Sequence, residues 1–404
     1  MKRIYLDYAA TTPIDPRVAK AMRDFELEYY GNPNSVHREG QNARAKIDYA
    51  RGVVAKFINA KPQEIIFTSG ATESNNLAIQ GVIRHATDIL KIKKPHVVTT
   101  KLEHQSVYNT VKELEKRGVV EATFVSPSKD GLIEPEQVIR AIKKNTVLVS
   151  TIFVSNEIGS ILPVREIGGL IRANKRIVYH IDAVQAAKFF NCNVDKLNCD
   201  LLTLSAHKIY GPKGIGALYI KSGSKLQNLA YGGSQEYGKR PGTQNTAGII
   251  GMAQAVELLG SLEDRHSSAK KLTILRDMLI SELSKIAQVE LNGPTGELRT
   301  PDNVNFLVYG VDQDSLITAL DLSGIAASTG SACVSGSSEP SHVIQALGKL
   351  GFDLGATVRF TLGRDTTRAE INNVIRIFKK VISELRDRTK QFHPRTKKIK
   401  GSTK

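Results

Sequence analysis

The sequence predicts an α/β protein with a mostly parallel sheet in a large domain and a second, smaller α+β domain. Short apolar segments alternate with stretches of helical periodicity between residues 64 and 186. This alternation is typical of parallel strands covered by helices on both faces. The chain has 404 residues, which is too long for one small domain. We therefore expect ligands to bind at the carboxyl ends of the strands.

The predicted strands of the large domain follow one another with helices between them. In chain order, residues 64–70 precede a helix at 71–86, residues 96–100 precede one at 104–118, and residues 145–156 precede one at 163–175; a further strand follows at 176–186. Residues 201–204 and 217–220 are apolar and predict two more buried strands. Glycines and a proline between them favour a tight turn.

The second half of the chain has a different pattern. Residues 249–286 have the periodicity of one long helical stretch, which could link two domains. Shorter strands and helices follow and predict the smaller domain. We expect a large cofactor-binding domain at 16–262, a small domain formed by 1–15 and 263–385, and a basic, disordered tail at 386–404.

Composition bounds the class of protein. Hydrophobic residues make up 41% and charged residues 24% of the chain, as in soluble globular proteins. No segment approaches the ~18 uninterrupted apolar residues of a membrane span, and the first residues lack the apolar stretch of a signal peptide. We expect a cytoplasmic protein without membrane contact. Three cysteines, none in a C-x-x-C pair, exclude a disulfide framework and a zinc site of that type.

The net charge of +16 would ordinarily suggest an acidic partner such as nucleic acid. Eight lysines and arginines but one aspartate lie from Arg386 onward, so the folded body is only moderately basic. Aromatic residues make up 6% of the chain, and no nucleic-acid-binding motif is recognisable. A basic nucleic-acid-binding protein is therefore the weaker, non-enzymatic alternative.

Lys208 lies in the turn between two predicted buried strands. Most lysines of a basic chain are solvated surface cations. Near buried apolar groups, however, a lysine loses hydration, which lowers its pKa and leaves more free amine to attack a carbonyl. Lys208 is thus a candidate nucleophile.

Two further polar clusters follow predicted strands. Small residues, including Ala71 and Thr72, lie between a strand and a helix, where backbone N–H groups can hold a phosphate or where a side chain simply caps the helix. Asp182 ends another strand. It either caps the next helix or serves as the carboxylate that keeps a pyridine nitrogen protonated.

Cys333 lies in a segment dominated by Ser, Gly and Ala, residues 327–342, a composition that predicts a loop. We expect its thiol to be exposed and reactive. Cys192 and Cys199 lack such a loop and are expected to be structural.

Seven motifs resemble those of the cysteine desulfurases, which are pyridoxal phosphate enzymes of aminotransferase class V. The motifs occur in the same order along the chain as in that family. They are YLDYAATTP at 5–13, GNPNSVHREGQ at 31–41, TSGATESNN at 68–76, SNEIG at 155–159, HIDAVQA at 180–186, SAHKIYGPKGIGALY at 205–219 and STGSACVSG at 328–336. The resemblance spans residues 4 to 385 and implies the aminotransferase-like fold type I. It also implies conversion of L-cysteine to L-alanine with a persulfide on Cys333.

The resemblance implies a role for each matching residue. Lys208 would bind the aldehyde of pyridoxal 5′-phosphate, Asp182 would pair with its pyridine nitrogen, and Gln185 would contact its phenolic oxygen. His104 would stack on the ring and move protons. The phosphate would be held by Ala71, Thr72, Ser205, His207 and, from the neighbouring subunit of a homodimer, Thr243. The substrate carboxylate would be held by Asn156 and Arg359, with Asn156 also contacting the cofactor.

The chain departs from the family at Pro241, where most members have serine before the Gly-Thr pair. Proline removes a backbone donor and puts the cross-subunit contact of Thr243 in question. No metal is expected, apart from transient ligation of an iron–sulfur cluster by Cys333.

The resemblance implies a sulfur acceptor, either an iron–sulfur scaffold protein or a protein of tRNA thiolation. The basic tail is either a loose electrostatic tether to an acidic acceptor or to tRNA, or only a solubilising extension. Alternative activities are those of a selenocysteine lyase, a cysteine sulfinate desulfinase or a pyridoxal phosphate aminotransferase.

Overall fold

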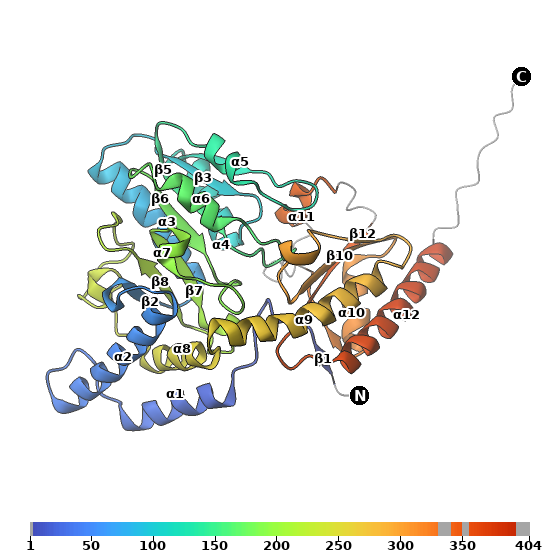
Figure 1. Cartoon of the computed structure of the whole chain (residues 1–404), viewed down its shortest axis with the longest axis horizontal. Helices are drawn as coiled ribbons and strands as arrows, with labels where there is room; N and C mark the ends of the chain where they lie inside the picture. The colour runs from blue at the N-terminus through green and yellow to red at the C-terminus, as the bar shows by residue number, and fades with distance from the viewer. Residues whose placement is uncertain (1–2, 330–340, 350–354, 393–404) are drawn as a thin grey trace, which may run out of the picture.

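The computed structural model describes residues 3–329, 341–349 and 355–392, with the backbone alone for 388–392. A seven-stranded sheet occupies the larger part of the molecule, and a three-stranded sheet occupies one end (Figure 1). The strands of the large sheet lie in the order β2-β8-β7-β6-β5-β3-β4. Their bounds are β2 Ile65–Thr68, β3 His96–Thr100, β4 Glu121–Val125, β5 Thr146–Ile152, β6 Val178–Asp182, β7 Leu201–Ser205 and β8 Gly216–Ile220.

The large sheet is parallel from β7 through β4, whereas β8 runs antiparallel to both of its neighbours. The strand β2 therefore has the same direction as β7. As a result, β2, β3, β5, β6 and β7 end at one edge of the sheet. The α/β class and the mostly parallel sheet predicted from the sequence are confirmed.

Helices cover both faces of the large sheet. Their bounds are α1 Pro16–Glu28, α2 Arg38–Phe57, α3 Ala71–Arg84, α4 Gln105–Lys116, α5 Pro135–Arg140, α6 Val164–Ile171, α7 Val194–Leu197 and α8 Thr246–Leu258. Neighbouring strand residues point to opposite faces. Val97 packs in the core beneath α3 and α4, and Val98 packs in the other core with α2, α6 and α8. Two covered faces explain why β3, β5 and β7 are buried at every position.

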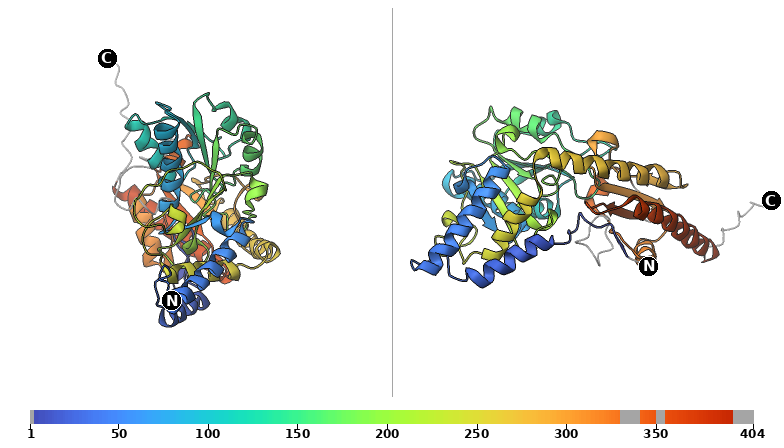
Figure 2. Two further views of the ribbon diagram at one scale, coloured as in Figure 1. Left: turned by 90° about the vertical axis from the view of Figure 1, so that its left-hand side faces the viewer. Right: turned by 60° about the horizontal axis from the view of Figure 1, so that its bottom comes forward.

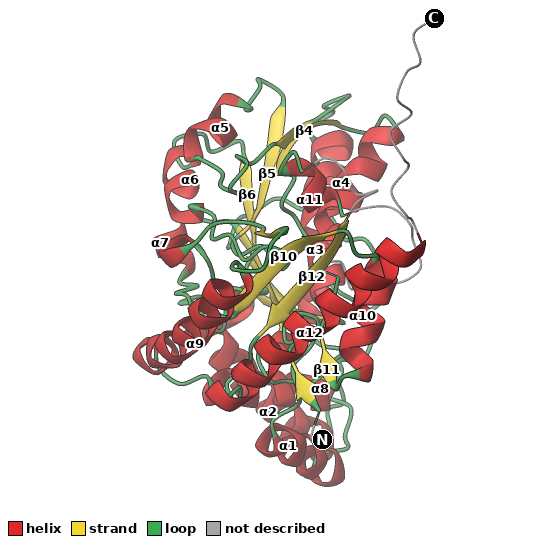
Figure 3. Cartoon of the chain, turned by 90° about the vertical axis from the view of Figure 1, so that its right-hand side faces the viewer, coloured by secondary structure: helices red, strands yellow, loops and turns green. Residues whose placement is uncertain are grey.

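The small sheet has the antiparallel order β12-β10-β9. Its strands are β9 Val289–Leu291, β10 Asn303–Tyr309 and β12 Gly355–Thr361, and its helices are α9 Leu262–Leu283, α10 Gln313–Leu322 and α12 Arg368–Phe392. Phe306, Phe360 and Phe378 form the centre of a separate core there. Figures 2 and 3 show these helices gathered around the small sheet, with α9 extending back toward the large one.

The long helix predicted at 249–286 is in fact two helices. Gly260 has φ of 73° and ends the run after α8, a conformation that glycine adopts without strain. Ser261 and Asp264 then form a reciprocal capping box that starts α9. The prediction of one continuous helix was wrong because the apolar periodicity on both sides of Gly260 masks the stop and start signals.

The N-terminal segment joins the two parts of the molecule. Strand β1, Ile4–Tyr5, pairs in parallel with β11, Ile325–Ala326, and Leu6 is buried in the small core. Farther along, the N–H of Thr12 donates to the carbonyl of His207 at 2.9 Å. The intervening residues therefore form a strap from the small sheet to the end of β7.

The C-terminal helix extends past the boundary that the sequence predicts at residue 385. Helix α12 continues to Phe392, and Arg386 donates to the carbonyls of Tyr309, Ala287 and Gln288 at 2.8 to 3.1 Å. Arg386 thus anchors the helix against the small sheet and is no part of a disordered tail. Within the described part of the chain, no helix combines the length and apolarity that crossing a membrane requires.

Candidate active site

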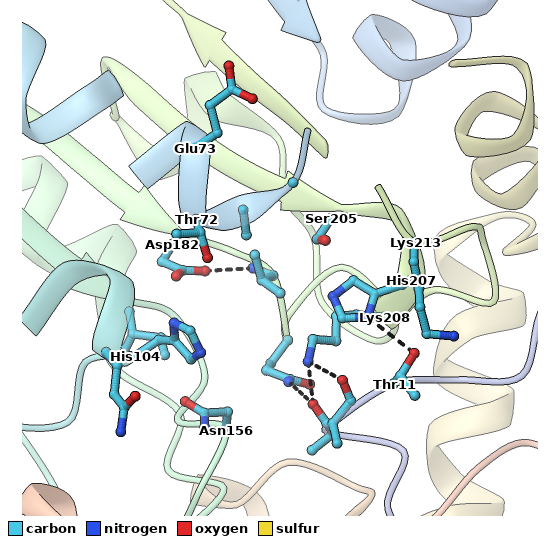
Figure 4. A pocket seen from close by; sticks show the side chains of 18 of the residues that line it. Thr11, Thr72, Glu73, His104, Asn156, Asp182, Ser205, His207, Lys208 and Lys213 are labelled. Atoms are coloured by element: carbon cyan, nitrogen blue, oxygen red, sulfur yellow. Dashed lines mark hydrogen bonds between the residues drawn. The ribbon is translucent and has the colours of Figure 1, made fainter. Parts of the chain in front are cut away.

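A pocket of about 460 Å³ opens at the edge where the parallel strands of the large sheet end. Turns after β2, β3, β5, β6 and β7 line it, together with the N-terminal strap and one residue of the small sheet. The residues predicted for the site that line this pocket are Ala71, Thr72, His104, Asn156, Asp182, Gln185, Ser205, His207, Lys208 and Arg359 (Figure 4). These predicted residues thus lie together at the strand ends, where the sequence predicts that a ligand binds.

Lys208 ends a short 3-10 turn, Ala206–Lys208, that directly follows β7. Its Nζ donates to the carbonyls of Ala9 and Ala10 at 2.6 and 2.7 Å. The strap therefore fixes where the amine sits in the pocket. The predicted position between two buried strands is confirmed, whereas the lowered pKa of Lys208 stays a prediction.

Asp182 ends β6 and is 2% exposed. Its Oδ2 accepts from Nδ2 of Asn75 at 2.8 Å and its Oδ1 from the backbone N–H of Val184 at 3.1 Å. Gln185, one turn later, donates from Nε2 to the carbonyl of Ala9 at 3.0 Å. A buried carboxylate at the base of the pocket is what a protonated pyridine nitrogen requires.

His104 caps the N-terminus of α4 and lies across the pocket from Lys208 (Figure 4). Its Nδ1 accepts from the backbone N–H of Ser106 at 3.2 Å and lies 2.8 Å from the Ser106 hydroxyl. Burial lowers the pKa of His104, and the negative charge of Asp182 partly opposes that shift. The ring is therefore neutral near pH 7.

The far end of the pocket is suited to a phosphate. Helix α3 begins at Ala71 beneath Gly70, and no side chain caps its first turn. The hydroxyl oxygen of Ser205 is buried and has no hydrogen-bond partner within the described residues. A Cβ on Gly216 would lie 2.8 Å from the carbonyl carbon of Gly70, so only glycine lets β8 pass this turn. An unpaired donor beside free helical N–H groups fits a bound phosphate.

His207 and Lys213 also line this end of the pocket. Burial, followed by the charges of Lys208 and Lys213, lowers the pKa of His207 to about 4. His207 Nδ1 lies 3.2 Å from Oγ1 of Thr11. A bound dianion would counteract the neighbouring positive charges and raise this pKa.

The opposite end of the pocket contains Arg359, which comes from β12 of the small sheet and is 1% exposed. Its Nη1 donates to the carbonyl of Asn156 at 2.9 Å, and its Nη2 pairs with Oδ1 of Asp7 at 2.9 Å. The guanidinium is thus held between the large sheet, the strap and the small sheet. A planar cation at this place suits a carboxylate ligand.

The remaining predicted site residues lie elsewhere. Thr243 is exposed and does not line the pocket of its own chain, so its contact across subunits stays a prediction. In that segment, Nε of Arg240 donates to Oε1 of Glu73 at 3.0 Å. Cys333 falls outside the described residues.

The other two cysteines are buried. Burial raises the pKa of Cys192 to about 12 and raises that of Cys199 as well. Such thiols are poor nucleophiles. Their surroundings agree with the structural role predicted for them.

Sequence reasoning missed several residues that shape the site. They are Asp7, Ala9, Ala10, Thr11, Asn75, Ser106 and Lys213. Most of them lie within the motifs YLDYAATTP, TSGATESNN and SAHKIYGPKGIGALY, so the resemblance covered these residues without giving them a role. Across the described ranges, no group of three or more acidic, His or Cys side chains has the arrangement of a metal site.

Comparisons with known proteins agree with this geometry. The model of the aminotransferase class-V family matches residues 4–374. The cysteine desulfurase IscS of Dictyoglomus turgidum is 45% identical over 96% of both chains.

Solved structures are also similar. A NifS-like protein superposes with a TM-score of 0.84 at 33% identity, covering 95% of this chain and 99% of its own. SspA in complex with cysteine superposes with a TM-score of 0.77 at 35% identity, covering 90% of this chain and 100% of its own.

Proposed function

The chain belongs to the cysteine desulfurases of aminotransferase class V, and from that premise we propose how its residues convert L-cysteine to L-alanine and retain the sulfur on Cys333. The enzyme depends on pyridoxal phosphate, as this family does. The arrangement of Lys208, Asp182 and Ser205 around one pocket supports this proposal most directly. It supplies an amine, a buried carboxylate and an unpaired donor at separate places in that pocket.

Pyridoxal phosphate supplies an electron-withdrawing ring that stabilises the charge left when an amino acid loses its α-proton. The chain holds and orients this group. Lys208 binds its aldehyde, Asp182 its pyridine nitrogen and Gln185 its phenolic oxygen. The first turn of α3, Ser205 and His207 hold its phosphate.

Other residues position the substrate and move protons. Arg359, with Asn156, binds the carboxylate of L-cysteine and thereby fixes the direction of its side chain. His104 would stack on the ring and help to move protons, and Lys208 would provide the second proton-transfer group.

The sulfur transfer needs a thiolate that reaches the substrate. The thiolate of Cys333 attacks the substrate sulfur, an S–S bond forms, the Cβ–S bond breaks, and Cβ gains a proton. L-cysteine and one enzyme thiol thus give L-alanine and one enzyme persulfide, so atoms and electrons balance without another oxidant.

Alanine release from L-cysteine by two matched variants tests this assignment. We expect Cys333→Ala to bind cofactor and L-cysteine but to release alanine very slowly. The control, Cys192→Ala, removes a buried thiol and should retain turnover. Normal turnover by the Cys333 variant would overturn the assignment. Parallel assays with selenocysteine, cysteine sulfinate and an amino-group acceptor separate the alternative activities, since an aminotransferase would form a keto acid.

We further propose a homodimer in which Thr243 completes the phosphate site of the partner. Leu27, Tyr30 and Val36 are large apolar side chains that are 76 to 89% exposed near the α1–α2 connection. Asn34 in that connection lies 3.5 Å from Gln244, next to Thr243. Exposed apolar groups beside a predicted cross-subunit contact support an interface there. Light scattering of wild type and Tyr30→Lys tests it, with a shift to monomer expected.

The acceptor of the persulfide sulfur is proposed to be an iron–sulfur scaffold protein or a protein of tRNA thiolation. The basic residues beyond 392 would steer an acidic acceptor electrostatically. The cytoplasmic location stays a prediction from the sequence.

A further inference from the structure

Four buried or half-buried polar side chains form a hydrogen-bonded row from the base of the pocket to the ring of His104. Nδ2 of Asn75 lies 2.8 Å from Oδ2 of Asp182 and 2.8 Å from Oγ of Ser106. The same Ser106 hydroxyl lies 2.8 Å from Nδ1 of His104. The row therefore joins β6, α3 and α4, three separate elements of the large sheet and its cover.

The carboxylate fixes the direction of the two hydrogen bonds that Asn75 makes in this row. A carboxylate only accepts, so the Asn75 amide must present its NH₂ group to Asp182. The reversed amide would bring two acceptor oxygens to within 2.8 Å of each other. In the observed orientation, Oδ1 of Asn75 is buried without a partner in the described part of the chain. One N–H of the amide donates to Asp182, and the other donates to the Ser106 hydroxyl.

Because Ser106 Oγ accepts from Asn75, its own proton is available for Nδ1 of His104. The backbone N–H of Ser106 independently donates to the same nitrogen at 3.2 Å. Two donors thus face Nδ1, and the backbone one cannot reverse. A proton on Nδ1 would point at the backbone N–H of Ser106 and leave that donor without its acceptor, even if the hydroxyl turned to accept.

We propose that Asn75 and Ser106 are positioning residues that transmit the orientation set by Asp182 to His104 and hold its ring as the neutral tautomer with the proton on Nε2. This inference rests on the proposed function only for the role of His104 in turnover. In this tautomer His104 presents an N–H donor to the pocket from Nε2, while Nδ1 accepts from Ser106.

Nitrogen NMR of the full-length holoenzyme with ¹⁵N-labelled histidine tests the proposal. The signals of His104 are identified by their loss in His104→Gln. We expect a pyridine-type Nδ1 signal and a pyrrole-type Nε2 signal that persist from about pH 6 to about pH 8, a range around the ordinary histidine pKa. A pyrrole-type Nδ1, or a ring that becomes doubly protonated in this range, would overturn the proposal.

A hydroxyl deletion tests the role of Ser106. Ser106→Ala should move the Nδ1 signal toward that of a nitrogen with one hydrogen bond fewer. It should also reduce kcat by about 2- to 10-fold with little change in KM, the scale of one lost hydrogen bond. Ser106→Thr should restore both, because it retains the hydroxyl. If the Nδ1 signal of Ser106→Ala were identical to that of wild type, the Ser106 hydroxyl would not hydrogen-bond to His104, and the proposal would be contradicted.

Thr110→Val is the matched control. Thr110 is one turn farther along α4 and donates to the carbonyl of Ser106 at 2.8 Å, not to its hydroxyl. Its replacement should leave the His104 signals unchanged; a shift equal to that of Ser106→Ala would mean that α4 merely moves, and would contradict the proposal. If the enzyme released no alanine from L-cysteine while His104 kept this tautomer, the proposed function would fail and the inference about His104 would stand.

Discussion

The two ends of the pocket are built in different ways. At the cofactor end, Asp182 is the last residue of β6, and Lys208 lies in the turn after β7. These two strands pair in parallel in one sheet, so the backbone of a single core sets the spacing of the two side chains. At the substrate end, Arg359 comes from β12 of a separate core. It reaches the pocket through contacts with Asp7 and the carbonyl of Asn156, both at 2.9 Å.

The difference teaches that the two ends should respond separately to mutation. The cofactor end depends on strand order within one sheet and should survive changes in the small sheet. The substrate end depends on how the small sheet, the strap and the large sheet meet. A change at Arg359 should therefore alter substrate affinity while the cofactor stays bound.

The largest effect is expected at the cofactor end. Lys208→Ala should abolish covalent attachment of the cofactor and lower alanine production by about a thousandfold or more, because the aldehyde has no internal amine partner. Absorbance of the purified variant and alanine release measure both effects. Covalent cofactor attached to another lysine of this variant would contradict the account.

Arg359→Lys should weaken substrate binding without affecting cofactor binding. Lysine keeps the charge but loses the planar pair of donors that matches a carboxylate. We expect KM for L-cysteine to rise about 10- to 100-fold, the scale of one or two hydrogen bonds between charged groups, with unchanged cofactor absorbance. Loss of cofactor with an unchanged KM would show that the two ends are not separate.

A smaller effect is expected from Glu103, which is buried beside His104. Its Oε1 accepts from the Thr100 hydroxyl at 2.7 Å and from the N–H of Ile152 at 2.9 Å. Burial raises its pKa from 4.5 to about 8. Between these values the folded state holds a proton that the unfolded state has lost, so the free energy of unfolding falls as pH rises through this window.

The Glu103→Gln variant lacks this titrating carboxyl group. We expect the decline in Tm between about pH 5 and about pH 8 to become shallower by a few degrees relative to wild type. Thermal unfolding at several pH values measures the slope. An unchanged slope would mean that Glu103 is ionised in the folded protein.

The smallest effect is expected from the basic residues beyond Phe392. Deleting 393–404 should leave alanine production with a small thiol reductant unchanged, because that reaction needs no acceptor protein. Sulfur transfer to the acceptor protein should slow at low salt only, because screening removes electrostatic steering. A Gly/Ser segment of equal length is the control, and equal transfer by all forms at low salt would leave the tail without this role.

The sequence predicted the cofactor end better than the substrate end for a physical reason. Asp182, Ser205 and Lys208 end or follow apolar strands, and parallel strands end at one edge. The ties of Arg359 to Asp7 and to the backbone of Asn156 depend on how two cores meet, which no local pattern reports.

Other features that the sequence analysis did not predict either depend on packing between separate elements or had a local signal that was overlooked. The row through Asn75 and Ser106 depends on the packing of α3 against α4 and could not be inferred from spacing. The break between α8 and α9 did have a local signal, since Gly260 is followed by the Ser261–Asp264 capping box. Arg386 continues the basic pattern of the tail, but three backbone carbonyls hold it in α12.

The central claim is that this pocket passes the sulfur of L-cysteine to Cys333. Mass spectrometry of peptides after one turnover with ³⁴S-labelled L-cysteine, under conditions that preserve persulfides, tests it most directly. The account predicts one added labelled sulfur on the peptide that contains Cys333, in the same amount as the alanine released. Labelled sulfur on Cys192 or Cys199, or alanine released without any labelled protein sulfur, would contradict it.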